Sequence, residues 1–257
     1  MQQNCPNCGS TKVKKNGHAK STGKQNNYCN NCGRNFCDDA NKEIVSYEKQ
    51  CMIRSAFNEK ISLRGICRVF SVSMTWLQGF FKREAELQPD DLCFDLDLAF
   101  KINYGEDFDP SRKHGLSIFC EADELCTFVG KKKNKKWVWI ALDFETKQII
   151  AFHVGDRSKK SCRKLWRKIP VEYRMHTFVF TDHLKSYKCV IPESKHDDVD
   201  KGTGLTSLIE AFNNKLRQRL ARLGRKACSF SKSTDNLIKS IHMFIVEHNL
   251  KIQLKYE

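Results

Sequence analysis

The fold of this chain is decided by the stretch Leu116-Ser-Ile-Phe-Cys-Glu-Ala-Asp-Glu-Leu-Cys-Thr-Phe-Val129, followed by Trp137-Val-Trp-Ile-Ala-Leu142 and Gln148-Ile-Ile-Ala-Phe-His-Val154. Apolar residues dominate all three segments, and short polar connections over residues 130–136 and 143–147 separate them. Strands of this length with such connections are typical of an antiparallel meander.

After the meander, the sequence predicts a helix, a further strand and two more helices. A basic helix is expected over Lys159–Lys168, then a strand over His176–Thr181 that ends in Asp182. A long helix is expected from about residue 208 to 223, and a last amphipathic helix over roughly 234–248. Three meandering strands, a helix, another strand and further helices predict a ribonuclease H-like core.

Two short helices are predicted upstream, around the turn Ser71-Val72-Ser73, after a first helix over residues 43–58. Ser62 and Ser73 are suitable N-caps for them. Their inner faces are expected to carry Ile66, Val69, Val72, Leu77 and Phe80. The pattern is typical of a helix-turn-helix whose second helix enters a major groove. An ordinary helical hairpin is the alternative, because the turn lacks the glycine often found there.

Two cysteine pairs open the chain, Cys5-Pro-Asn-Cys8 and Cys29-Asn-Asn-Cys32, with twenty residues between them. Two such pairs can supply the four thiolates of a tetrahedral Zn²⁺ site. The intervening segment is rich in lysine, including Lys14 and Lys15. The sequence predicts a zinc ribbon that contacts DNA, and a zinc-stapled module with no direct DNA role is the alternative.

The charge distribution indicates that this α+β chain is divided into several domains. The net charge of +15 in 257 residues favours a polyanionic partner, of which nucleic acid is the commonest. Residues 1–88 carry +7 and residues 116–257 carry +12, whereas residues 89–115 carry −4. We expect a zinc ribbon in residues 1–40, a helix-turn-helix domain in 41–88, an acidic linker in 89–115 and the ribonuclease H-like domain in 116–257. Within the linker, alternating Phe94, Leu96, Leu98 and Phe100 would suit a short strand.

Carboxylates of the last domain are candidates for a magnesium or manganese site, because these hard cations prefer oxygen ligands and catalyse phosphodiester cleavage. Asp123 lies inside a predicted strand, close to Glu121 and Glu124. Burial of a carboxylate there is costly unless it is paired or binds metal. Asp182 stands at a strand end. A solvated strand face and a simple turn residue are the respective alternatives.

Glu210 is the third candidate, near the start of the predicted long helix. In Ser207-Leu-Ile-Glu210 it could instead complete a capping box with Ser207. At about 100° per residue, Glu210 and Arg217 share one polar face off the apolar stripe. The arginines and lysines that follow predict a contact with the DNA backbone, with a solvated basic helix as the alternative.

Several motifs resemble transposases of the insertion-sequence-one family. The resemblance is carried by Leu216-Arg-Gln-Arg-Leu-Ala-Arg-Leu-Gly-Arg-Lys-Ala-Cys-Ser-Phe-Ser-Lys-Ser233, by Glu121-Ala-Asp-Glu-Leu-Cys-Thr-Phe-Val-Gly130, by Phe180-Thr-Asp-His-Leu-Lys-Ser-Tyr187 and by the cysteine pairs. It implies a DDE transposase in which Asp123, Asp182 and Glu210 bind metal. Arg217 then corresponds to the basic residue that the family has seven residues after this glutamate. It is weakest over residues 84–115, and residues 211–215 depart from the family pattern, so no role is assigned to Asn213.

The resemblance implies an enzyme that binds terminal inverted repeats, cleaves 3′ ends with Mg²⁺ or Mn²⁺ and joins them to target DNA. The expected DNA-contacting residues are Lys14, Lys15, Thr75, Trp76, Lys82, Arg83, Arg219, Arg222, Arg225 and Lys226. We expect a homo-oligomer in the prokaryotic cytoplasm, associated with the nucleoid and with no membrane partner. The thirteen cysteines, odd in number and without a secretory signal, favour a reducing compartment. A nuclease that does not join ends and a transcriptional regulator with a non-catalytic domain are the competing interpretations.

Overall fold

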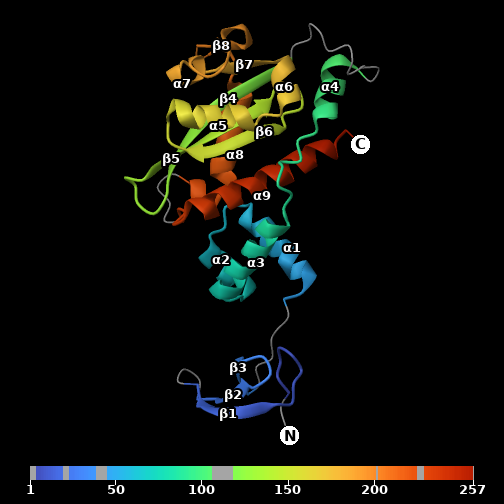
Figure 1. Ribbon diagram of the computed structural model, residues 1–257, viewed down its shortest axis with the longest axis vertical. Helices are drawn as coiled ribbons and strands as arrows, with labels where there is room; N and C mark the ends of the chain where they lie inside the picture. The colour runs from blue at the N-terminus through green and yellow to red at the C-terminus, as the bar shows by residue number, and fades with distance from the viewer. Residues whose placement is uncertain are drawn as a thin grey trace. The chain divides into compact units, whose positions relative to one another are not determined.

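The computed structural model describes residues 4–19, 23–38, 45–105, 118–200, 202–224 and 229–256. The chain divides into two compact units, Met1–Gln50 and Cys51–Glu257 (Figure 1). Arg225 and Lys226, two expected DNA contacts, lie outside the described residues.

The first unit contains a three-stranded antiparallel sheet of β1 (Val13–His18), β2 (Gln25–Cys29) and β3 (Asn35–Cys37), in that order. Its small core contains Cys5, Cys29 and Phe36. So few buried apolar residues give little hydrophobic stabilisation, and domains of this size usually need a metal or disulfides.

The second unit is built on a five-stranded mixed sheet in the order β6-β5-β4-β7-β8. The meander is confirmed, because β5 pairs antiparallel with both β4 and β6. β7 and β8 then extend the other edge in parallel. The strands are β4 (Ile118–Phe128), β5 (Lys135–Asp143), β6 (Ile149–Gly155), β7 (Thr177–Thr181) and β8 (His196–Asp198).

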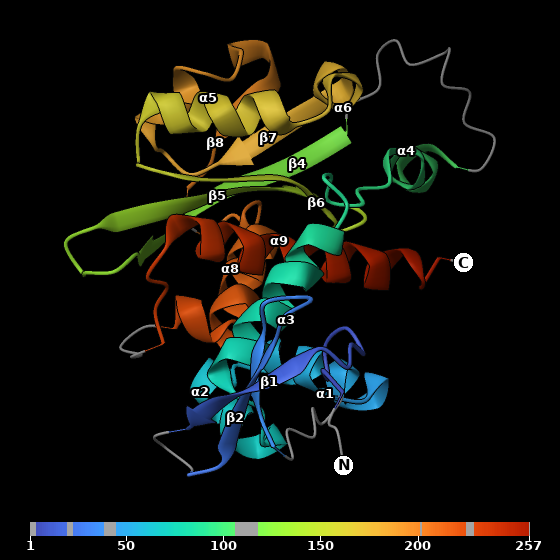
Figure 2. The ribbon, with the colours of Figure 1, turned by 60° about the horizontal axis from the view of Figure 1, so that its bottom comes forward.

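Helices cover both faces of this sheet, α5 and α6 on one and α8 and α9 on the other (Figure 2). Their bounds are α5 (Lys159–Lys168), α6 (Val171–His176), α8 (Ser207–Arg219) and α9 (Thr234–Gln253). The central strands are buried on both sides, and Val138, Trp139, Ile140 and Ala141 of β5 have no exposed surface. The predicted order of the strands and helices expected here is therefore confirmed, and α6 and β8 are additional elements that the sequence did not predict.

The helices that follow the first sheet are α1 (Tyr47–Phe57), α2 (Leu63–Phe70) and α3 (Met74–Leu87). Both predicted N-caps are confirmed, since the hydroxyls of Ser62 and Ser73 accept hydrogen bonds from Gly65 and Trp76 N–H. Ser71 ends α2 in the left-handed conformation, at φ 50°, without a glycine. The expectation that Val69 faces inward is wrong, because its side chain is 65% exposed.

A helix replaces the short strand expected in the acidic stretch. α4 (Leu96–Tyr104) is capped by Asp95, whose carboxylate accepts a hydrogen bond from Leu98 N–H at 2.9 Å. Ala99 and Phe100 are buried in the core beside the sheet, so α4 packs against the second unit and is not part of a linker. The alternation of apolar residues was misleading here, because Leu96 and Phe100 are four residues apart and therefore also lie on one face of a helix.

The remaining short elements follow β7 or α8: α7 (Lys185–Lys188), η2 (Glu193–Lys195) and η3 (Ala221–Leu223). Among the described residues, no helix is both long enough and apolar enough to span a membrane.

Candidate active site

The parallel pairing of β4 with β7 brings two of the predicted carboxylates together. Ala122 lies opposite Thr181 in the ladder, so the residues that follow them, Asp123 and Asp182, are neighbours. Carboxylate oxygens of Asp123, Glu124 and Asp182 all lie within 4.8 Å of one another. This spacing suits a small divalent cation that binds several oxygen ligands at about 2.0–2.6 Å.

Glu124 differs from the two aspartates in having its charge already balanced. Arg157 contacts its Oε1 through Nη2 at 2.6 Å and Nε at 2.8 Å, and the Tyr187 hydroxyl donates to Oε2 at 3.1 Å. The Glu124 side chain is almost wholly buried. With both oxygens engaged, Glu124 is a poorer candidate ligand than Asp123 or Asp182.

The cluster carries unfavourable negative charge. Burial, followed by the charges of Asp182 and Glu210, raises the pKa of Asp123. Burial raises the pKa of Glu124 to about 7, with a further contribution from Asp182 and an opposing one from Arg157. Carboxylates that repel one another in a buried place are stabilised by a divalent cation, so the donor set fits Mg²⁺ or Mn²⁺.

Glu210, the third predicted ligand, lies in the first turn of α8 and is exposed. The structure does not bring its carboxylate into the cluster of the other acids among the described residues. Its charge nevertheless contributes to the raised pKa values of Asp123 and Glu121. The capping-box alternative is not observed, because Thr206 is the N-cap and makes no side-chain capping hydrogen bond.

Two residues of β4 attach α8 to the site. The Asn213 amide donates to Asp123 Oδ2 at 2.7 Å, one helical turn after Glu210. The fully buried Glu121 accepts the Ile209 N–H at 2.7 Å. Glu121 therefore meets the N-terminus of α8, where a negative charge is favourable, although burial raises its pKa to about 7. These contacts fix the helix that carries Glu210.

Arg217 lies in a different environment from the one expected. Its guanidinium donates to the Cys126 carbonyl at 2.9 Å and to the Leu223 carbonyl at 3.4 Å. These bonds join the C-terminal part of α8 to β4 and to η3. In this arrangement Arg217 supports the backbone around the site.

The four predicted zinc ligands form a second cluster, in the first unit. The Sγ atoms of Cys5 and Cys32 are 3.6 Å apart, as are those of Cys8 and Cys29. A tetrahedral site with Zn–S bonds of about 2.3 Å has sulfur–sulfur edges of roughly 3.8 Å. Gly9 and Gly33 adopt φ near +70° and donate N–H bonds to the Cys5 and Cys29 carbonyls, so the two turns match. The donor set fits zinc.

The predicted DNA contacts are unevenly placed. The exposed residues are Lys14, Lys15, Thr75, Lys82 and Arg83, while Trp76 is half-buried and stacks on Phe80. Arg219 forms an ion pair with Glu59. Arg222 is half-buried and donates to the Ser231 hydroxyl at 3.3 Å.

Sequence reasoning missed Asn213, Arg157 and Tyr187. An arginine some thirty residues after Glu124, or an asparagine on a helix, gives no signal without the sheet register that brings them together. Glu121 did give a signal in the sequence, because alternation along the strand places it on the same face as Asp123.

Comparison with known proteins gives one consistent result for the second half of the chain. Residues 117–251 match the profile of the family described as IS1 transposase. The chain is 35% identical over 134 residues to the insertion element iso-IS1n protein InsB of Shigella dysenteriae, covering 52% of this chain and 98% of that protein. It is 31% identical over 137 residues to the insertion element IS1 protein InsB of Shigella sonnei, covering 53% of this chain and 96% of that protein.

A further relative is the insertion element IS1 4 protein InsB of Escherichia coli K12, with 31% identity over 137 residues that cover 53% of this chain and 75% of that protein. The matched family region contains the sheet, the acidic cluster, α8 and most of α9. The chain therefore belongs to the IS1 transposase family.

Proposed function

We propose that the protein binds the terminal inverted repeats of an insertion sequence, cleaves the DNA 3′ ends and transfers them to target DNA. The observation that carries this proposal is the convergence of Asp123 and Asp182, with the helix of Glu210 hydrogen-bonded to Asp123. Membership of a transposase family makes DNA the expected partner and DNA cleavage the expected chemistry.

In this proposal Asp123, Asp182 and Glu210 hold Mg²⁺ or Mn²⁺. When bound, such an ion activates the attacking oxygen and stabilises the leaving oxygen of the phosphodiester. Asn213 holds the Asp123 carboxylate in position, and Arg157 keeps Glu124 from adding a free negative charge. Arg217 acts by fixing β4 against α8, since its guanidinium is engaged by carbonyl groups.

A ribonuclease H-like fold for residues 116–257 is supported by the sheet. An antiparallel meander extended by two parallel strands, with helices on both faces, agrees with that class. The domain boundaries at residues 40, 88 and 115 remain predictions.

For DNA-end recognition we propose the zinc ribbon together with α2 and α3 as a helix-turn-helix. α3 presents Thr75, Lys82 and Arg83 to solvent, as a recognition helix must. In the ribbon, Lys14 and Lys15 are exposed on β1. Oligomer formation and a place in the bacterial cytoplasm, near the nucleoid, belong to the same proposal.

A strand-transfer assay with labelled terminal-repeat DNA tests the proposal. Asp182→Asn and Glu210→Gln should each lower product formation by at least about 1,000-fold, because a bound metal contributes several kcal/mol to the transition state. Matched controls are Asp197→Asn on β8 and Glu172→Gln in the first turn of α6, both exposed acids. Full strand transfer by Asp182→Asn would contradict the catalytic assignment, and repeat binding without joined products would favour a regulator.

A further inference from the structure

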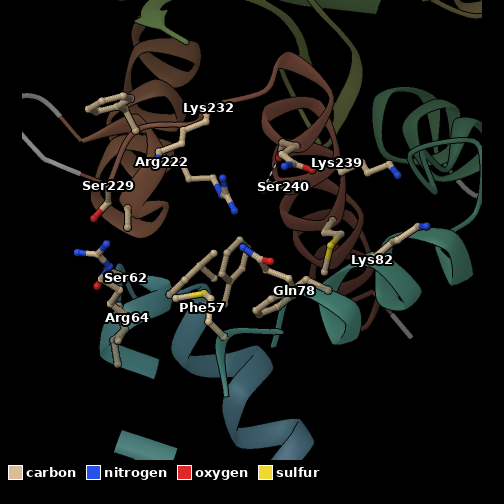
Figure 3. A pocket seen from close by; sticks show the side chains of 18 of the residues that line it. Phe57, Ser62, Arg64, Gln78, Lys82, Arg222, Ser229, Lys232, Lys239 and Ser240 are labelled. Carbon is tan, nitrogen blue, oxygen red and sulfur yellow. Dashed lines mark hydrogen bonds between the residues drawn. The ribbon is translucent and has the colours of Figure 1, made fainter. Parts of the chain in front are cut away.

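A groove lies within the second unit, on the side of α8 and α9 away from the sheet. Its volume is about 1110 Å³. One wall comes from the end of α1 and from α2 and α3, and the other from η3, residues 229–232 and α9 (Figure 3). The wall that carries the proposed recognition helix thus faces the C-terminal helices of the catalytic domain.

The two walls are held together by direct bonds. Lys60 N–H, just after α1, donates to the Arg219 carbonyl of α8 at 2.7 Å. Asn58 contacts Glu247 of α9 through its side-chain amide. Further along, His242 of α9 contacts the Pro89 carbonyl at 2.8 Å. These bonds fix the two walls relative to each other, so the groove is part of the folded second unit.

The lining is strongly basic. It contains six cationic side chains and, among the described residues, no Asp or Glu. Cations come from both walls: Arg64, Arg68 and Lys82 from α2 and α3, and Arg222, Lys232 and Lys239 from the opposite side. Lys82 and Lys239 come from opposite walls and point toward the same end in Figure 3. Like charges gathered in this way repel one another unless an anion lies between them.

Arg222 has the clearest need for such an anion. Its side chain extends into the gap between the walls (Figure 3). Burial lowers the pKa of its guanidinium. Among the described residues, its guanidinium donates one side-chain hydrogen bond, to the neutral Ser231 hydroxyl, and its Nε is buried without a partner. A half-buried cation with no counter-ion among the described residues is costly, so the free protein bears a cost that a bound anion would remove.

We propose that this groove binds the sugar-phosphate backbone of a DNA strand, with a phosphate on Arg222 and neighbouring phosphates on Lys232 and Lys239. The inference rests on the proposed function and adds a second DNA site, shared by α3 and the catalytic domain. Nucleic acid fits better than an acidic peptide, because the partly exposed Phe81 and Phe230 also line the groove and offer surfaces to sugars or bases.

The first test replaces Arg222 by methionine in the full-length protein. Without DNA, Arg222→Met should melt at the same temperature as the unmodified protein or higher, because an uncompensated, half-buried charge is removed. DNA binding, measured by fluorescence anisotropy, should weaken. A marked fall in melting temperature with unchanged DNA affinity would show that Arg222 is only structural and would overturn the proposal.

The second test uses Lys232→Gln/Lys239→Gln, whose side chains are at least partly exposed and whose loss should leave folding intact. The slope of log affinity against log salt should fall by about 1.8 on duplex DNA or about 1.4 on single-stranded DNA if both lysines contact phosphates. The two probes thus identify the form of DNA bound. The control, Lys251→Gln, removes one charge from α9 outside the groove and should leave the slope unchanged.

Two outcomes oppose the proposal: a double variant with the unmodified slope, or polyglutamate competing as well as DNA of equal charge. Both measurements are made without divalent metal, so they do not depend on cleavage. Full strand transfer by Asp182→Asn, together with the expected change of slope in the double lysine variant, would refute the catalytic assignment and leave the groove proposal standing. Normal strand transfer with no groove contribution refutes the groove alone.

Discussion

Asn213 on α8 donates a 2.7 Å hydrogen bond to Asp123 on β4, and this bond joins the two elements that carry the first and third proposed metal ligands. Asn213 is 6% exposed, and its Oδ1 has no partner among the described residues. The Asn213 side chain is therefore held at the acidic cluster by its Nδ2 donor, while its Oδ1 acceptor makes no hydrogen bond with the described residues. This contact couples the position of α8 to the position of the Asp123 carboxylate.

Asn213→Ala should reduce strand transfer by about 10–100-fold, the usual effect of losing a residue that orients a metal ligand. It should destabilise the fold by only about 1–3 kcal/mol, the range for a broken buried hydrogen bond. The control is Asn214→Ala, an exposed neighbour on the same helix. Equal rates for the two variants in a strand-transfer time course would show that the hydrogen bond does not serve the site.

Arg157→Met should destabilise the protein because Glu124 would remain buried without its cation. Breaking a buried pair costs about 3–5 kcal/mol, and the partial exposure of Arg157 places the effect near the lower end. The loss should be larger at pH 8 than at pH 5.5, where Glu124 can take up a proton. Adding Glu124→Gln should restore most of the stability in urea titrations. No recovery in the double variant would assign the loss to packing of Arg157 on Trp137.

The stability that Glu121 and Glu124 contribute to the metal-free protein should decline as the pH rises through neutrality. Both carboxyls have pKa values raised to about 7 in the fold, against an ordinary value of 4.5. Their contribution is therefore complete below about pH 4.5 and is lost as the pH passes 7. Half-buried His153 and His248, with pKa values lowered to about 4, give the opposite trend below about pH 6.5, so the test compares variants. From pH 5.5 to 8 the melting temperature of the unmodified protein should fall relative to that of Glu121→Gln and stay level relative to that of Glu172→Gln. A difference between the unmodified protein and Glu121→Gln that does not change with pH would refute the assignment.

Zinc should account for the stability of the first unit, since its core is small. Cys29→Ser should lose the bound zinc found by atomic absorption, and Cys37→Ser, a nearby cysteine outside the cluster, should keep it. Removal of zinc by a zinc-selective chelator, with Mg²⁺ kept in excess, should weaken binding to terminal repeats without stopping cleavage of pre-nicked DNA by the second unit. Retention of one zinc per chain by Cys29→Ser would contradict the four-cysteine site.

Local patterns predicted most of the fold. The strand pattern of residues 116–154, the cysteine spacing and the serine caps each specify structure through nearby residues. The helix α4 was missed because its apolar spacing fitted a strand as well, and only packing of Ala99 and Phe100 decides between them.

The site was less predictable. Asp123 and Asp182 converge because of the β4–β7 register, which a single sequence does not specify. The partners Asn213, Arg157 and Tyr187 come from α8, from the connection between β6 and α5, and from α7. Arg217 shares a helix face with Glu210 in a helical projection, but the carbonyl groups of Cys126 and Leu223 draw its guanidinium toward β4 and η3.

The central claim is that Asp123, Asp182 and Glu210 serve one metal centre, and electron paramagnetic resonance of Mn²⁺ titrated into the protein tests it most directly. The account predicts saturable Mn²⁺ binding that Asp123→Asn and Asp182→Asn abolish, that Glu210→Gln weakens and that the control Asp197→Asn leaves unchanged. Unchanged Mn²⁺ binding in Asp123→Asn and Asp182→Asn would contradict it.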